Sequence, residues 1–202
     1  MMQRIIFLGL LSSMFVLGGV IQGSAQIRID VPEPGGAGLP IAVSPLSSVS
    51  VGGSQQLGDE FADVILRDLD LSGLFRPIDR SAYIEGPSNV ALEEINFQNW
   101  STLGALALAK GGFWLDGERL TVEARLFDVA QRKQLTGKRY RGERKDIRRM
   151  AHRFADQIML SLTGELGPFS SKIAFVSNRG NGRAKELFTT DLTGAEIDQV
   201  TR

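Results

Sequence analysis

The chain of 202 residues contains no cysteine, which excludes disulfide bonds, thiolate metal sites and cysteine nucleophiles. This absence does not fix the compartment, because exported proteins can also lack cysteine. Neither charge is in excess: 23 lysines and arginines balance 23 aspartates and glutamates. Composition therefore gives no electrostatic reason to expect a nucleic-acid partner.

Sequence motifs of enzymes are also missing. Neither a GxSxG nor a Walker pattern is present, and the single histidine, His152, excludes a zinc site built on two histidines. His152 lies in an expected helix among Arg148, Arg149 and Arg153, so we expect it at the margin of that helix. We predict a protein that is not an enzyme and needs no metal and no cofactor.

The N-terminus is the only place with a long apolar run. Arg4 precedes an apolar stretch from residue 5 to residue 21, and Gly23 and Ala25 follow two residues apart. This is the three-part pattern of a secretory signal peptide over residues 1–25, with cleavage between Ala25 and Gln26. An uncleaved membrane anchor is the alternative. No later segment is apolar enough to span a bilayer.

Residues 26–40 combine a short alternating pattern with a flexible stretch. Ile27, Ile29 and Val31 alternate with polar residues and could form one strand, whereas the proline- and glycine-rich residues after them cannot extend it. A peptide of this kind is suited to pair with the exposed edge of a sheet. The alternative is a frayed terminus.

Residues 41–166 show alternating strand and helix patterns. The spacing predicts a strand at 41–43, a helix around 57–69, an edge strand at Pro77, a short helix with Trp100 in the core, a hairpin at Asp116-Gly117, and a long helix over 147–162 that ends at Gly164. We therefore predict an α+β domain whose two main helices cover one face of a mixed β-sheet.

The stretch 132–149 is rich in lysine and arginine. It could form a patch for an acidic protein, an anionic lipid or a nucleic acid. The alternative is a corner between a strand and a helix with a solvated cationic face.

Residues 169–202 read as three short strands with a D-x-x-G turn at Asp191–Gly194. This pattern resembles a β-propeller blade, which normally holds about four strands and packs between neighbouring blades. We therefore expect a partial first blade, and we expect the chain to be the front part of a longer protein that continues past Arg202.

Two longer stretches carry a family resemblance. "AHRFADQIMLSLTGELGPFSSKIAFVS" (151–177) and "GERLTVEARLFDV" (117–129), together with the position of Trp100, resemble the TolB family of periplasmic Tol-Pal proteins. The resemblance extends over residues 26–202. It implies an α+β N-terminal domain followed by a six-bladed propeller.

The resemblance also implies a function. Family members are periplasmic adaptors that are peripheral to the envelope membranes and have no nucleic-acid partner. They maintain outer-membrane integrity and help the outer membrane invaginate at cell division. Their propeller binds the peptidoglycan-associated lipoprotein Pal, through blades that this chain does not contain, and their N-terminal strand contacts TolA or folds back on its own protein. The residues that match this strand are Ile27, Arg28, Ile29, Asp30 and Val31, while Asp191, Gly194 and Thr201 match structural positions of a blade.

A different class of protein remains as an alternative. The chain could be the N-terminal part of a secreted, propeller-fronted hydrolase, whose GxSxG motif would then lie downstream. A nucleic-acid binder is a third possibility, and it predicts a steep dependence of binding on salt.

Overall fold

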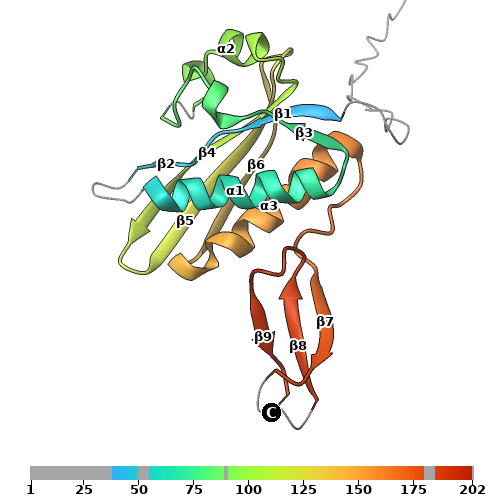
Figure 1. Cartoon of the computed structure of the whole chain (residues 1–202). Helices are drawn as coiled ribbons and strands as arrows, with labels where there is room; N and C mark the ends of the chain where they lie inside the picture. Colours follow the sequence, from blue (N-terminus) through green and yellow to red (C-terminus); the bar gives the residue numbers. More distant parts are fainter. Residues whose placement is uncertain (1–37, 50–54, 89–90, 180–184, 202) are drawn as a thin grey trace, which may run out of the picture.

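The computed structural model describes residues 38–49, 55–88, 91–179 and 185–201. Within them, an α+β domain is followed by a separate three-stranded sheet (Figure 1). The predicted cleavage site at Ala25 and Gln26 and the predicted partner-binding strand at 27–31 lie outside the described residues. Among the described residues, no helix is both long and apolar enough to cross a bilayer.

The main sheet has six strands among the described residues. It is mixed, as predicted. Its main path follows the order β3 (Phe75–Pro77), β1 (Leu39–Val43), β4 (Ala107–Asp116), β5 (Arg119–Asp128) and β6 (Lys133–Glu143), and β2 (Ser47–Ser48) pairs with β4 beside it. β1 runs parallel to β3 and β4, whereas β4, β5 and β6 are antiparallel.

Several local predictions about the sheet are confirmed. β3 lies at the edge of the described sheet, where the missing N–H of Pro77 is tolerated. The β4–β5 hairpin turns at Gly117, whose φ of 59° lies in the left-handed region that glycine adopts readily. β1 begins at Leu39, two residues before the strand that the apolar pattern predicts.

The helices follow the predicted apolar stripes. α1 (Gln55–Leu71) and α3 (Ile147–Thr163) are each 17 residues long, and α2 (Phe97–Thr102) is short. Three 3₁₀ turns, at Arg80–Ala82, Leu92–Glu94 and Arg144–Asp146, occur in the connections. α3 ends at Gly164, which has a φ of 84° and donates its N–H to the carbonyl of Leu160.

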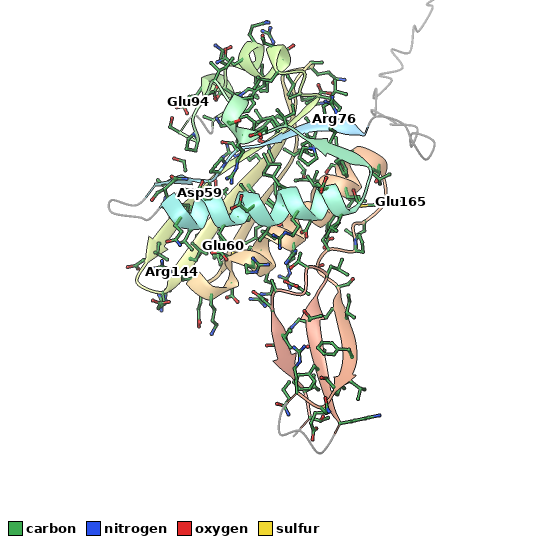
Figure 2. The ribbon with its side chains drawn as sticks, viewed as in Figure 1. Asp59, Glu60, Arg76, Glu94, Arg144 and Glu165 are labelled. Atoms are coloured by element: carbon green, nitrogen blue, oxygen red, sulfur yellow. The ribbon has the colours of Figure 1, made fainter. Side chains whose placement is uncertain are left out.

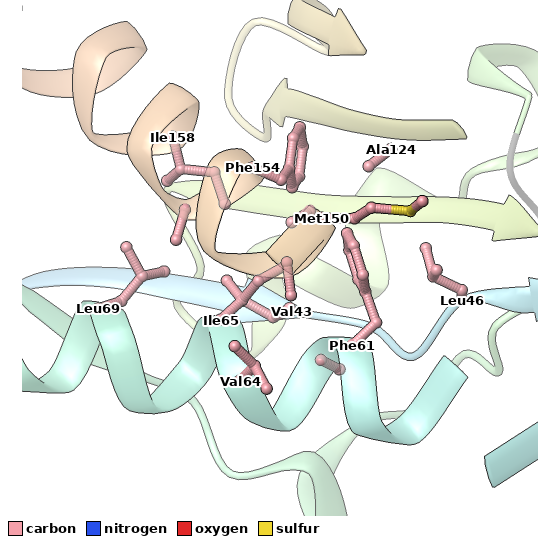
Figure 3. Packing of buried hydrophobic residues seen from close by; sticks show 14 of the residues in the cluster. Val43, Leu46, Phe61, Val64, Ile65, Leu69, Ala124, Met150, Phe154 and Ile158 are labelled. Carbon is pink, nitrogen blue, oxygen red and sulfur yellow. The ribbon is translucent and has the colours of Figure 1, made fainter. Parts of the chain in front are cut away.

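The larger core lies between the sheet and the pair α1 and α3. Figure 3 shows Phe61, Ile65 and Leu69 of α1 pointing toward Met150, Phe154 and Ile158 of α3. The rings of Phe61 and Phe154 stack with their centroids 6.2 Å apart. Both main helices therefore cover one face of the sheet, which confirms the predicted α+β architecture.

A smaller core lies on the opposite face of the sheet. Ala42, Leu108 and Phe127 point away from α1 and α3, because side chains alternate along each strand, and they pack against α2. Trp100 of α2 is completely buried there, as predicted, and its ring meets Tyr83 edge-on at 4.9 Å.

The C-terminal sheet contains β7 (Lys172–Ser177), β8 (Glu186–Asp191) and β9 (Ile197–Gln199), all antiparallel and in that order. These are the three strands that the sequence predicts. Ile173, Val176, Ile197 and Val200 are exposed on it. Figure 1 shows this sheet projecting from the end of the domain that carries α3.

Candidate functional site

His152 lies between the two main helices, and the expectation that it lies at the margin of its helix is wrong. Its exposed fraction is only 4%. Its Nδ1 atom lies 2.7 Å from Oδ2 of Asp68, which is fully buried on α1. The sequence contains a signal that Asp68 is buried, because it follows Val64 by four residues on the apolar face of α1, and a carboxylate buried there requires a partner. The sequence does not identify His152 as that partner.

The surroundings of this pair set its protonation. Burial raises the pKa of Asp68, although the hydrogen bond and charge of His152 offset part of that effect. Burial by itself lowers the pKa of His152, but the hydrogen bond and charge of Asp68, with the charge of Asp191, outweigh it and raise this pKa above its usual 6.5. In neutral His152 the ring proton belongs on Nδ1, because this nitrogen faces the carboxylate.

The other ring nitrogen of His152 faces the C-terminal sheet. Its Nε2 lies 3.6 Å from Oδ2 of Asp191, the last residue of β8. In a hydrolytic triad this nitrogen would face a nucleophilic hydroxyl. Here it faces a second carboxylate, so the arrangement suits electrostatic contact between two parts of the chain rather than nucleophilic attack.

Asp191 is shared between its own turn and α3. Its Oδ1 accepts hydrogen bonds from Thr193 Oγ1 at 2.8 Å and from the Ala195 N–H at 2.9 Å. Its Oδ2 accepts a bond from Arg148 Nη2 at 3.4 Å, and Arg148 Nε lies 3.4 Å from Glu196 Oε1. The sequence predicted only a structural role for Asp191 within a blade, and the contact with α3 was missed.

A third buried carboxylate fixes the segment that joins the two parts. Asp156 of α3 accepts hydrogen bonds from the N–H groups of Phe169 at 2.7 Å and Ser170 at 3.2 Å, and from the Ser170 hydroxyl. Phe169 is buried against the main core. The connection between α3 and β7 is therefore held by specific bonds.

Most of the basic stretch 132–149 lies on β6 and on the corner where β6 passes into α3, which Arg144 marks in Figure 2. Several of its cations have partners: Arg139 pairs with Glu123, Lys145 with Glu143 at 2.7 Å, and Arg149 with Asp146 at 2.8 Å. The structure thus places the stretch on a strand–helix corner. Arg148 differs from the others, because it lies in the contact with the C-terminal sheet.

Among the hollows elsewhere on the domain, two differ in polarity. One, of about 430 Å³, follows α1 beside Asp59, Glu60 and Asp63, of which Asp59 and Asp63 pair with Arg80. The other, of about 200 Å³, is mainly apolar and includes Leu39, where β1 begins, and Leu162 of α3. No group of three or more histidine, aspartate or glutamate side chains among the described residues could hold a metal ion.

Comparison with protein families gives one match, which covers residues 27–135 and is described as the TolB amino-terminal domain. Two curated relatives are each named "Tol-Pal system protein TolB". The one from Syntrophotalea carbinolica is 42% identical over 88% of this chain and 41% of its own length. The one from Geobacter metallireducens is 40% identical over 75% of this chain and 35% of its own length.

A solved structure agrees at the level of the fold. The crystal structure of TolB from Acinetobacter baumannii matches 82% of this chain and 39% of its own chain, with a TM-score of 0.62 and 22% identity. The chain thus spans at most about two fifths of the length of these relatives.

Proposed function

The chain belongs to the TolB family, and on that premise we propose that it acts as a non-enzymatic periplasmic adaptor that links TolA to Pal in the Tol-Pal envelope system. Such an adaptor maintains the outer membrane and supports its invagination at division. The observation that carries the proposal is the extent of the family match, which starts at residue 27 and therefore includes the whole segment from Ile27 to Val31.

The physical mechanism that we propose is strand addition by this segment. Ile27, Ile29 and Val31 would form one face of a strand, and the prolines and glycines after them would separate it from β1, which begins at Leu39. Each main-chain hydrogen bond contributes about 0.5–1.5 kcal/mol net. A segment of this length can therefore exchange partners easily.

The contact with Pal is proposed for the complete protein. The exposed apolar residues of β7–β9, Ile173, Val176 and Ile197 among them, support a sheet that packs against neighbouring blades. We assign residues 169–202 to the start of a propeller, and Pal binding to later blades.

Deletion of residues 26–33 tests strand addition. Calorimetric titration with purified TolA should show loss of binding. Circular dichroism and the unfolding midpoint should stay unchanged, because the first strand among the described residues begins at Leu39, after the deleted segment. Affinity equal to that of the intact chain would contradict the proposal.

A single substitution separates main-chain pairing from side-chain contact. Ile29→Pro removes an N–H group and cannot continue a paired strand, so binding should weaken by about 2- to 12-fold for each hydrogen bond lost. Ile29→Val keeps the strand and is the matched control. Equal affinities of the two variants for TolA would show that main-chain pairing does not drive the contact.

A further inference from the structure

We propose that the contact between His152 and Asp191 is a pH-operated latch that holds the sheet β7–β9 against the α+β domain. The latch joins three elements: Asp68 on α1, His152 on α3 and Asp191 at the end of β8. It concerns how two parts of this chain are held together, and it does not depend on any partner protein.

The location of the titrating proton is the first step. Asp68 engages Nδ1 at 2.7 Å and holds that proton in both states of the ring. The proton that His152 gains as pH falls must therefore reside on Nε2, which is buried and has no hydrogen-bond partner among the described residues. Since Nε2 lies 3.6 Å from Oδ2 of Asp191, the new charge acts directly on the C-terminal sheet.

The orientation of Asp191 is the second step. Thr193 and Ala195 both bond to Oδ1, which leaves Oδ2 directed at α3. Gly194, with a φ of 72°, permits the tight turn that brings the Ala195 N–H back to this carboxylate. The D-x-x-G turn therefore presents a fixed acceptor to α3.

Other charges around the ring are compatible with this role. Arg148 on α3 competes for Asp191 and repels protonated His152, while Asp156 on the same helix and Glu196, between β8 and β9, add negative charge nearby. Arg149, Arg153 and Lys172 line a separate hollow of about 200 Å³ that also includes His152 and Asp191. Of these, Arg149 pairs with Asp146 and Lys172 with Asp198.

The direction of the pH dependence follows from the shifts. The pKa of His152 is raised above 6.5, so its stabilising contribution is fully present below that pH and is lost as pH rises through the folded-state pKa. Burial alone would raise the pKa of Asp191, but the hydrogen bonds from Thr193, Ala195 and Arg148, with the charge of His152, lower this pKa below 3.8. The contribution of Asp191 to stability is therefore present above pH 3.8 and is lost only as pH falls through the lowered pKa. The latch is closed below pH 6.5 and opens as pH rises through the folded-state pKa of His152.

Because His152 is the only histidine, its ring gives a single titrating histidine signal in the NMR spectrum of the whole chain. Asp191→Asn should lower the pKa of His152, because it removes the negative charge that faces Nε2. Asp198→Asn is the matched control: this exposed carboxylate of the same sheet pairs with Lys172, so its loss should leave the His152 titration unchanged. An unchanged pKa in Asp191→Asn would overturn the proposal.

The latch itself can be observed by a spin-label distance. The chain has no cysteine, so Lys138→Cys and Gln199→Cys place labels only at two exposed sites, one in each part. The distance distribution should be narrow at pH 6 and broaden toward longer distances at pH 9. In the Asp191→Asn variant the distance distribution should be broad at both pH values. In the Asp198→Asn variant it should be narrow at pH 6 and broad at pH 9, as in the parent chain.

His152→Gln provides a second variant, since its side-chain amide can still bond to Asp68 but cannot gain a charge. Its distance distribution should be the same at pH 6 and pH 9. A parent distribution that does not change with pH, or a pH response that persists in His152→Gln, would overturn the latch.

Discussion

At the scale of single residues, two buried ion pairs join segments that lie far apart in the chain. One is Asp68 with His152, and the other is Glu85 with Lys110, whose side chain is completely buried. The Lys110 ammonium donates to Glu85 Oε1 at 2.7 Å and to the Gly86 carbonyl at 2.9 Å, and lies 5.4 Å from the centre of the Trp100 ring. Such a pair is costly to break, because a buried charge needs a partner.

Removal of Glu85 tests the second pair. Burial already lowers the pKa of Lys110, although Glu85 offsets part of that shift. Glu85→Ala would leave the ammonium without its counter-ion, so unfolding in urea should show a loss of about 3–5 kcal/mol. The double variant Glu85→Gln with Lys110→Met should recover most of this. Glu93→Ala, at an exposed carboxylate, should stay within about 0.5 kcal/mol, and equal losses for Glu85→Ala and Glu93→Ala would refute the prediction.

The buried hydroxyl of Tyr140 should make the stability of the fold depend on pH in alkaline solution. Burial raises its pKa to about 12, although the charge of Arg153 offsets part of the shift, and its hydroxyl has no hydrogen-bond partner among the described residues. An unfolded tyrosine ionises near pH 10, so stability is complete below that pH and falls as pH rises toward 12. Tyr140→Phe should lose less stability than the parent between these values.

Tyr83 supplies the contrast for that measurement. Its hydroxyl accepts a bond from the Val43 N–H at 2.9 Å and donates to the Ile78 carbonyl at 3.1 Å. Tyr83→Phe should therefore lose about 1 kcal/mol at pH 7, where Tyr140→Phe should lose nothing. Thermal unfolding of both variants at pH 7 measures the two losses of stability. A larger loss for Tyr140→Phe than for Tyr83→Phe would contradict this account.

At the scale of elements, the apolar pattern was enough to predict α1 and α3, and the Asp116-Gly117 pair was enough to predict the hairpin between β4 and β5. The periodicity of the apolar residues correctly predicted α3, although not the burial of His152 on it, and Gly164 correctly predicted its end. The pattern could not predict the partner of His152, because Asp68 lies 84 residues earlier and only the packing of α1 on α3 brings them together. The contact of Asp191 with Arg148 and His152 was missed for the same reason.

Two positions on α3 test how far its buried face supports the domain. Ile158 is completely buried in the main core, whereas Leu160 is 40% exposed on the same helix. Ile158→Ala should cost about 2–5 kcal/mol of the free energy of unfolding, because it removes packed atoms and leaves a cavity. Leu160→Ala should cost less than about 1 kcal/mol. Similar losses for the two variants in urea unfolding would show that α3 does not pack as described.

At the scale of the whole molecule, a domain with a mixed sheet is joined to a small sheet that leaves apolar residues exposed. The order of strands and helices predicted the α+β class, and the three C-terminal strands were also predicted. The sequence did not predict how the two parts meet, since the contact depends on charges from α1, α3 and the turn after β8. The segment to which we assign TolA binding precedes all of these elements.

Strand addition by residues 27–31 is tested most directly by amide hydrogen exchange, with and without TolA, on a chain that begins at Gln26. Pairing along one edge protects alternate amides of the added strand, because successive N–H groups point to opposite sides. We predict that alternate amides of residues 27–31 become protected when TolA is added. Exchange rates in this segment that TolA leaves unchanged would contradict the account.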